Sequence, residues 1–213
     1  MDIHFIYRSS PEKPQDPSRP SYFDKRICLE SFLRAVHALN TKAKITFIND
    51  GEIAHSILEL MEKNGKVINK KNLGNIGSLK FALNYVQSQN WPEEDLVYFS
   101  EDDYLYLKNA FTKLHEAVQQ LGHIDYFTLY DHPDRYRRTD DADGGRVNIY
   151  LSESHHWRAH ESTCQTYGVR LSALNRDRWI MNFAMLPQNT PRGREMFRAI
   201  QGLGKYKLKF PKH

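Results

Sequence analysis

Residues 95–103 read DLVYFSEDD, and this stretch decides the fold class. Its first part is apolar between Leu96 and Phe99, which is typical of a strand that helices cover on both faces of a sheet. It leads directly into neighbouring carboxylates at Glu101–Asp103, and carboxylates this close raise one another's pKa. A divalent Mg²⁺ or Mn²⁺ ion offsets that repulsion, because it prefers oxygen ligands. The stretch therefore predicts a buried strand that ends at a metal site. The alternative is a solvated acidic turn.

Strand and helix patterns alternate on both sides of this stretch. Successive strand–helix units predict a mostly parallel sheet with helices on both faces, which is a three-layer α/β sandwich. The predicted strands are 3–7, 44–50, 66–69, 95–100 and 124–132, and the predicted helices are 24–40, 52–65, 74–90 and 107–122.

Ligands of such sheets bind outside the carboxyl ends of the strands. We therefore expect the polar residues at these strand ends to share one edge of the sheet, although they are far apart in the sequence. They are Arg8, Asp50, Glu101–Asp103 and Asp131.

The second half of the chain is less regular. Residues 147–151 and 166–172 have strand patterns and are expected to form an antiparallel addition to the sheet, while 174–185 and 192–204 have helical patterns. Two polar stretches, 9–22 and 132–146, predict loops that cover the site. The basic tail ends without a helix cap, so we expect the chain to be the first part of a longer protein.

Composition excludes several classes of protein. The chain has 213 residues, 40% of them hydrophobic and 26% charged, so it is neither disordered nor collagen-like. No apolar run approaches the ~20 residues of a membrane span.

The net charge of +4 suits an anionic small ligand. The basic run at 135–138 has no recognition helix beside it, so we do not expect nucleic acid as a partner. With only two cysteines, Cys28 and Cys164, we expect reduced thiols and a cytoplasmic location.

Two further motifs have open interpretations. Residues 72–78 contain glycines and lead into a helix, so Gly74, Asn75 and Ser78 are candidates for holding a phosphate, and Lys80 could reach it. The alternative is a tight turn in which Ser78 caps the helix.

The histidines at 155, 156 and 160 suggest a metal. They lack the pattern of a zinc protease, so one histidine on the metal at Asp103 is more plausible, and polar packing around Trp157 is the alternative.

The motifs together resemble the GT-A glycosyltransferases, which use nucleotide sugars and have a Rossmann-like sheet. DLVYFSEDDYLY resembles the strand and DxD element of that family, in an EDD form. The resemblance implies that Asp103 binds Mn²⁺ or Mg²⁺ and that Glu101 and Asp102 contact the donor, although Glu101 replaces the usual first aspartate. FINDG implies that Asp50 contacts the nucleotide base, and IYRSS implies that Tyr7, Arg8 and Ser9 flank the nucleotide.

A narrower resemblance rests on DYFTLYDHPDRY and SHHWRAHESTCQTYG. These stretches are similar to a group with the pattern YxTLYDHPDxY and HWRxxxST, found in bacterial surface-polysaccharide enzymes and in capsid-glycosylating proteins of large algal DNA viruses. The resemblance implies that His156, Arg158, Ser162 and Thr163 line the donor or acceptor side. Separately, we expect His156 to be the histidine that joins Asp103 on the metal. The resemblance also implies host cytoplasm as the location if the protein is encoded by a virus.

The sequence therefore predicts a single GT-A domain over 1–213, in which 1–131 bind the nucleotide sugar and 132–213 form the acceptor side. The predicted reaction moves a hexose from a UDP-sugar resembling UDP-glucose to a hydroxyl of a glycan or glycoprotein, and the protein is expected to be a monomer. If the reaction inverts the anomeric carbon, a base is needed, and the candidates are Asp131, Asp134 and Glu161. The alternatives are a nucleotidyltransferase of the same fold, a hydrolase using His155, His156 and His160, and a glycan-binding module without activity.

Overall fold

The computed structural model describes residues 1–11, 19–130, 148–159 and 165–184, with side chains up to 181. The chain divides into two compact units, Met1–Ala173 and Leu174–His213, and each is described by itself. The predicted boundary between a nucleotide half and an acceptor half, at 131/132, lies outside the described residues. No described helix has the length and apolar character that a membrane crossing requires.

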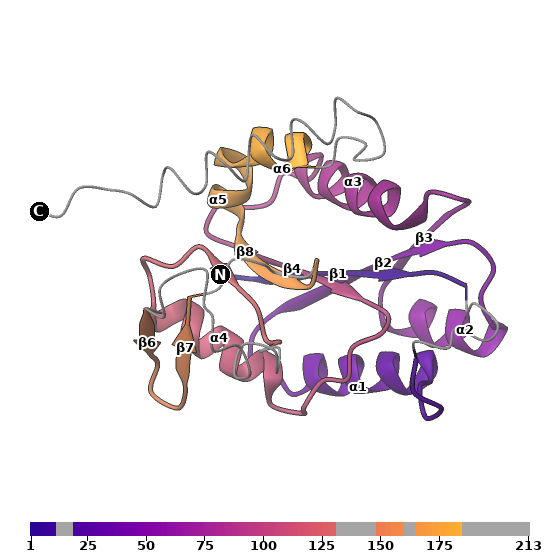
Figure 1. The fold of residues 1–213 in the computed structure, drawn as a ribbon, viewed down its shortest axis with the longest axis horizontal. Helices are drawn as coiled ribbons and strands as arrows, with labels where there is room; N and C mark the ends of the chain where they lie inside the picture. Colours follow the sequence, from indigo (N-terminus) through magenta and orange to yellow (C-terminus); the bar gives the residue numbers. More distant parts are fainter. Residues whose placement is uncertain (12–18, 131–147, 160–164, 185–213) are drawn as a thin grey trace, which may run out of the picture. The chain divides into compact units, whose positions relative to one another are not determined.

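A six-stranded sheet forms the centre of the first unit (Figure 1). Four neighbouring strands are parallel, as the alternating strand and helix patterns predicted, and their order in the sheet is β3-β2-β1-β4. The buried strands β1 and β4 pair in register from Ile3 opposite Leu96 to Arg8 opposite Glu101, which brings their carboxyl ends to the same edge. The bounds of these strands are β1 Ile3–Ser9, β2 Ala43–Asp50, β3 Lys66–Lys70 and β4 Leu96–Glu101.

The predicted antiparallel addition to the sheet is present in the second half of the chain, but its strand pairing differs from the prediction. β8 (Tyr167–Arg170) lies between β4 and β5 (Tyr126–Phe127) and is antiparallel to both. β6 (Ile149–Leu151) pairs with β7 (His156–Arg158) in a separate hairpin, so the two stretches expected to join the sheet do not lie in the same sheet. The prediction failed because each of these strands is at most four residues long, too short for alternation to show which partner it has.

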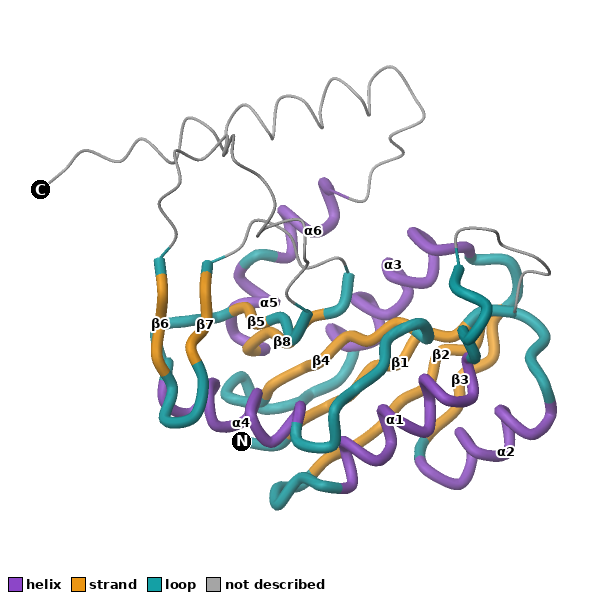
Figure 2. The backbone as a smooth tube through the Cα atoms, turned by 60° about the horizontal axis from the view of Figure 1, so that its bottom comes forward, coloured by secondary structure: helices purple, strands orange, loops and turns teal. Residues whose placement is uncertain are grey.

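Helices cover both faces of the sheet: α1, α2 and α4 lie on one face and α3 on the other (Figures 1 and 2). The side chain of Asp24 caps α1, because its Oδ1 accepts hydrogen bonds from the backbone amides of Arg26 at 2.7 Å and Ile27 at 3.1 Å. The bounds are α1 Lys25–His37, α2 His55–Asn64, α3 Gly74–Gln87 and α4 Ala110–Gln120.

The core on the α1 and α4 face consists largely of aromatic rings. Phe5 of β1 contacts Phe32 of α1 and Phe111 of α4, with ring centroids 5.5 and 4.6 Å apart in edge-on geometry. Tyr98 of β4 meets Phe111 at 5.0 Å. These packed rings fix α1 and α4 against β1 and β4, and they hold the strand ends that carry the site in a rigid frame.

The stretch 166–172 changes from strand to helix at Leu171, where α5 (Leu171–Arg176) begins and the chain passes into the second unit. Within that unit α6 covers Arg178–Ala184, so the helical pattern predicted over 174–185 is two short helices. The helix predicted over 192–204 lies outside the described residues.

Candidate functional site

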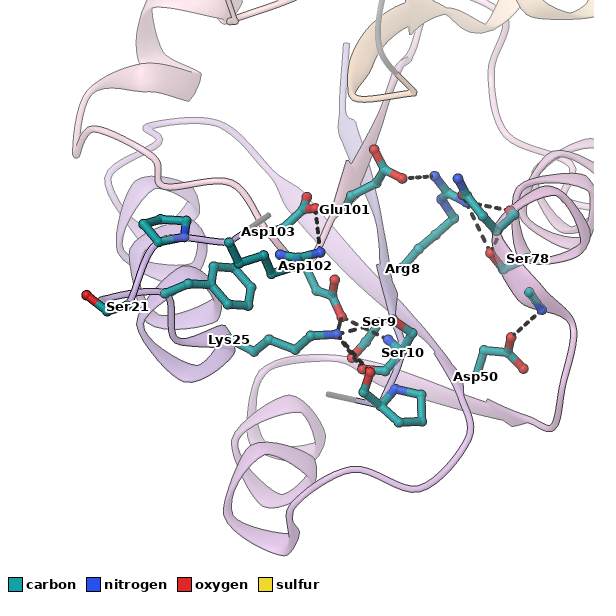
Figure 3. Close-up of a pocket in the computed structure, with 16 residues that line it drawn as sticks. Arg8, Ser9, Ser10, Ser21, Lys25, Asp50, Ser78, Glu101, Asp102 and Asp103 are labelled. Carbon is teal, nitrogen blue, oxygen red and sulfur yellow. Dashed lines mark hydrogen bonds and ion pairs between the residues drawn. The ribbon is translucent and has the colours of Figure 1, made fainter. Parts of the chain in front are cut away.

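A cavity of about 570 Å³ lies at the carboxyl ends of β1, β2 and β4, beside the starts of α1 and α3 (Figure 3). The carboxyl ends of these strands, the glycine-containing start of α3 and the acidic run Glu101–Asp103 therefore meet at one place, as expected for a parallel sheet. Its described lining includes these expected residues, namely Arg8, Ser9, Asp50, Gly74, Asn75, Ser78, Glu101, Asp102 and Asp103.

Arg8 joins three segments at the wall of this cavity. Its Nη1 donates to Asn75 Oδ1 at 3.1 Å and to Ser78 Oγ at 3.1 Å, so the guanidinium holds the start of α3. Its Nη2 donates to Glu101 Oε1 and to Gln165 Oε1, both at 2.9 Å. Burial lowers the pKa of Arg8 from its usual value, and the charge of Glu101 opposes that effect. Burial also raises the pKa of Glu101, with Arg8 opposing.

Asp50 caps α3 from a distance. Its Oδ1 accepts from the backbone amide of Leu73 at 2.9 Å and its Oδ2 from that of Gly74 at 2.8 Å (Figure 3). Ser78 is not the cap, because its hydroxyl donates to the carbonyl of Asn75 inside the helix at 3.0 Å. Asp50, which was predicted to contact the nucleotide base, therefore holds the backbone at the start of α3. Gly74 has a φ of 69° there, a left-handed value that favours glycine.

Lys25, the first residue of α1, binds the middle carboxylate of the acidic run. Its Nζ lies 2.6 Å from Asp102 Oδ2 and 2.6 Å from the carbonyl oxygen of Ser10. The amide of Ser10 donates to the same carboxylate oxygen at 2.8 Å. Both side chains of the ion pair are nearly buried, at 8% and 11% exposed. Asp102 therefore ties α1 and the segment after β1 to the end of β4.

Asp103 is the most accessible of the three carboxylates. Its side chain is 34% exposed, against 22% for Glu101 and 11% for Asp102, and its Oδ2 lies 3.2 Å from Nη2 of Arg19. The described residues hold no cluster of three or more metal-ligating side chains. Mg²⁺ and Mn²⁺ are commonly held by one or two carboxylates together with substrate phosphates and water. Asp103 fits that donor set as the protein ligand.

Several predicted site residues lie elsewhere. The ring of Tyr7 is 1% exposed and packs against Phe32 and Phe47 in the core, so it does not line the cavity. Lys80 is exposed on α3 and does not line it either. His156 and Arg158 lie on β7 and line a second cavity. Residues outside the described part of the chain are Asp131, Asp134, His160, Glu161, Ser162 and Thr163.

The residues of the site that were not predicted include Arg19 and Lys25, which line the cavity, and Gln165, which contacts Arg8. Lys25 follows the N-cap of a predicted helix, and a lysine at that place is ordinarily solvated, so nothing in the local sequence singles it out. Arg19 lies in a proline-rich loop. Gln165 has a left-handed backbone with a φ of 62°, and the local sequence does not predict this conformation.

No family model matches the chain, and no curated protein is significantly similar to it in sequence. Solved structures do match. A CMP:2-keto-3-deoxy-manno-octonic acid synthetase in complex with CTP has a TM-score of 0.50 and 13% identity, and the match covers 96% of this chain and 86% of that one. The chain has a Rossmann-like fold of the GT-A and nucleotidyltransferase type.

Two other solved structures are similar with lower scores. A 4-diphosphocytidyl-2C-methyl-D-erythritol synthase has a TM-score of 0.43 and 11% identity, covering 95% of this chain and 84% of that one. Residues 1–349 of S. aureus TarS have a TM-score of 0.47 and 14% identity, covering 84% of this chain. The match spans 49%, about half, of that TarS fragment.

Proposed function

We propose that the protein is a metal-dependent glycosyltransferase that moves a hexose from a UDP-sugar to a hydroxyl of a glycan. The observation that carries the proposal is the position of Asp103, the accessible carboxylate of the acidic run, in the same cavity as Arg8 and the start of α3. A carboxylate that holds a divalent cation and a positive charge that faces phosphate are the two elements that a nucleoside diphosphate needs. UDP and hexose are taken from the resemblance of the motifs.

Each residue of the cavity has a defined part in this proposal. Asp103 would hold Mn²⁺ or Mg²⁺, whose chemistry is to neutralise the charge that develops on the departing diphosphate. Arg19, whose Nη2 lies 3.2 Å from Asp103 Oδ2, would add positive charge beside the diphosphate. Arg8 and Ser78 would orient the diphosphate at the start of α3, where the helix dipole also favours negative charge. Lys25 keeps Asp102 in place beside the metal ligand.

The acceptor hydroxyl must lose a proton during the transfer. In an inverting reaction Asp131, Asp134 or Glu161 would accept that proton as a general base, in line with the resemblance of the motifs. A retaining reaction needs no such base.

A nucleotidyltransferase is the second candidate, and the similarity to the CTP-bound synthetase favours it. That reaction would place a nucleoside triphosphate in the same cavity and release pyrophosphate. A nucleotidyltransferase of this fold is expected to have a glycine-rich basic loop directly after the first strand, whereas β1 is followed here by Ser10 and Pro11. This difference supports the glycosyltransferase.

Calorimetry with UDP and with CTP, each with and without Mn²⁺, tests the proposal. We expect UDP to bind only with Mn²⁺, and Asp103→Ala to weaken that binding at least tenfold, about 1.4 kcal/mol. Glu59→Ala is the matched control, because Glu59 is an exposed acid on α2 outside the cavity. Tight binding of CTP without binding of UDP would favour nucleotidyl transfer, and no binding of either nucleotide would contradict both functions.

A product assay separates the two reactions directly. With a UDP-sugar and a glycan acceptor, or with water as a slow acceptor, the glycosyltransferase transfers the sugar and releases UDP and no pyrophosphate. With CTP or UTP and a sugar acid or sugar phosphate, a nucleotidyltransferase releases pyrophosphate instead. Pyrophosphate release that Asp103→Ala abolishes would overturn the glycosyltransferase proposal.

A further inference from the structure

A second cavity, of about 620 Å³, lies in the first unit between the segment after β4, the start of α4, the segment after β5 and the β6–β7 hairpin. It adjoins the first cavity at two points of the chain. Asp103 lines the first cavity, and the next residue, Tyr104, lines the second. Gln165 accepts a hydrogen bond from Arg8 in the wall of the first cavity, and the next residue, Thr166, lines the second. A ligand of the second cavity would therefore lie next to a ligand of the first.

Thr166 carries a buried hydroxyl group that the fold does not use. The residue is 1% exposed and lines the second cavity, and its side-chain oxygen has no hydrogen-bond partner in the described part of the chain. Its backbone is fixed, because its carbonyl oxygen accepts a hydrogen bond from Thr128 Oγ1 at 3.1 Å. Tyr167 pairs with Phe99, so Thr166 lies beside the carboxyl end of β4. Since buried polar groups are nearly always hydrogen-bonded, an unpartnered hydroxyl that lines a cavity marks a contact for a ligand.

Large aliphatic side chains are exposed around the same cavity. Leu105 is 63% exposed, Leu107 77% and Ile149 53%, and all three line it. They come from the segment after β4 and from β6, so their gathering is a property of the fold and not of one apolar stretch. Exposed apolar side chains that converge on a concavity mark a ligand site. Their aliphatic character favours a ligand with an alkyl or other apolar part.

The tyrosine rings of the wall suit a sugar. Tyr104 and Tyr130 meet edge to face, with centroids 5.6 Å apart and planes at 82°, so the two rings form a corner. The carbon-bound hydrogens of a pyranose pack against aromatic faces, while its hydroxyl groups need polar partners such as Thr166. Tyr104 directly follows the proposed metal ligand, and Leu105 and Leu107 come next along the same segment. This order suits a ligand whose sugar lies toward the donor and whose apolar part lies toward the leucines.

We propose that the second cavity is the acceptor subsite and that it takes a glycoside with an apolar aglycone. The pyranose ring lies against Tyr104 and Tyr130, and one of its hydroxyl groups bonds to Thr166. The apolar chain lies against Leu105 and Leu107. This inference rests on the proposed function, because it uses the adjoining cavity as the donor site. The transfer joins an acceptor hydroxyl oxygen to the anomeric carbon, breaks the bond from that carbon to the UDP oxygen and releases one proton.

Pairs of methyl and octyl glycosides test the inference on the full chain with UDP and Mn²⁺ present. The pairs are the glucosides, the galactosides and the mannosides, and octanol is the probe without a sugar. Binding is measured by calorimetry and saturation-transfer NMR, below the concentrations at which the octyl glycosides form micelles. We expect the octyl member of at least one pair to bind at least tenfold more tightly than its methyl partner and than octanol, because burial of each methylene adds to the affinity.

Two variants separate the two parts of the ligand. The double variant Leu105→Ala, Leu107→Ala should remove the preference for the octyl member and leave binding of the methyl member unchanged. Thr166→Val should weaken both members of the pair by the same factor. Because the hydroxyl of Thr166 has no partner in the described part of the chain, Thr166→Val should not lower the Tm, whereas loss of a structural hydrogen bond would.

Leu151→Ala is the matched control for the leucines. Leu151 is 73% exposed on the same hairpin and is not among the described lining residues, so its replacement should leave all binding unchanged. Equal binding of methyl and octyl members in every pair, octanol binding as tight as that of the octyl glycosides, or an octyl preference that the double variant retains would each overturn the inference. Absence of glycoside binding while UDP still binds would also overturn it. Glycoside binding without any UDP binding would retain the site and contradict the proposed function.

Discussion

The carboxylates at Glu101, Asp102 and Asp103 are neighbours in the sequence but have different environments. Glu101 pairs with Arg8, Asp102 is held by Lys25, and Asp103 is the most exposed of the three. An acidic run at a strand end is visible in the sequence, but this division is not, because the partner of Asp102 is 77 residues away. The motif therefore consists of one carboxylate in a buried ion pair with Lys25, one that pairs with the buried Arg8, and one, Asp103, that is accessible to the proposed metal ion.

Replacing Lys25 tests the structural part of this division. Lys25→Met leaves the Asp102 carboxylate buried without its cation, and losing one member of a buried pair costs about 3–5 kcal/mol. We expect urea unfolding to show a loss of stability of that order.

Arg26→Met is the matched control at the next position of the same helix. The Arg26–Glu30 pair is about half exposed on both sides, so its loss should cost about 0.5 kcal/mol or less. Equal losses for the two variants would show that burial does not decide the strength of the Lys25–Asp102 pair.

The junction between α2 and β3 shows how a helix end can be set by packing. Residues 64–65 were predicted to end the helix, and α2 does end at Asn64. The φ of Gly65 is 178°, an extended value open to any residue. What requires glycine is space: a Cβ atom there would lie 2.4 Å from the carbonyl oxygen of Ile45 on β2.

A glycine-to-alanine comparison tests this account. Gly65→Ala forces backbone atoms apart, and overpacking of this kind costs about 1–3 kcal/mol. Gly122→Ala, after α4, meets no atom within 4 Å and should be neutral or slightly stabilising. Thermal unfolding of the two variants measures the difference. A Gly65→Ala variant as stable as the native chain would contradict the packing explanation.

The central strands and the main helices of the sheet could be predicted because each is long enough to display a pattern. β1, β2 and β4 have six to eight residues and contain apolar runs, and α1, α3 and α4 have eleven to fourteen residues. β5, β6 and β7 have two or three residues each, and no period can be seen over that length. Their pairing depends on tertiary contacts and not on a pattern within each strand.

The positions of the site residues were predictable in part. Arg8, Asp50 and the acidic run lie at one edge because parallel strands bring their carboxyl ends together. Their hydrogen-bond partners were not predictable, since the contacts of Arg19 and Gln165 span 84 and 157 residues. Sequence patterns thus predict where the site lies, because they predict the sheet topology. The ion pairs and the exposure of each carboxylate depend on tertiary contacts, which the patterns do not show.

The opposite edge of the sheet carries a buried histidine that affects the stability of the whole chain. Nε2 of His4 lies 2.8 Å from Asp95 Oδ2, and its ring stacks on Trp91 at 3.8 Å. Burial lowers the pKa of His4 despite the attraction of Asp95. Nδ1 has no partner in the described part of the chain, so a second proton would be buried without an acceptor. The neutral ring is therefore the native form.

The sign of the resulting pH dependence follows from this lowered pKa. The unfolded chain binds the proton more readily, so the contribution of His4 is fully present above a pH of about 6.5 and is lost as the pH falls below it. We expect the free energy of unfolding to decline as the pH falls below about 7, with a slope of at most about 1.4 kcal/mol per pH unit from this group.

His4→Gln keeps a donor for Asp95 and removes the titration, so its urea-unfolding stability should depend less on pH over that range. His55→Gln is the control, because the side chain of His55 is 84% exposed. If His4→Gln followed the same pH curve as the native chain, His4 would not be the group responsible.

The stack of Trp91 on His4 also has a spectroscopic consequence. A charged imidazole quenches the emission of an indole in contact with it, so the fluorescence of Trp91 reads the protonation of His4 at the edge of the sheet opposite the carboxylates. Trp157 lines the second cavity and lies in a different environment, edge-on to Phe127 at 6.0 Å. At a fixed neutral pH, a change in emission on adding a ligand therefore reports from Trp157 or from Trp179, which is 66% exposed. In a Trp179→Phe variant, Trp157 is the optical label for that cavity.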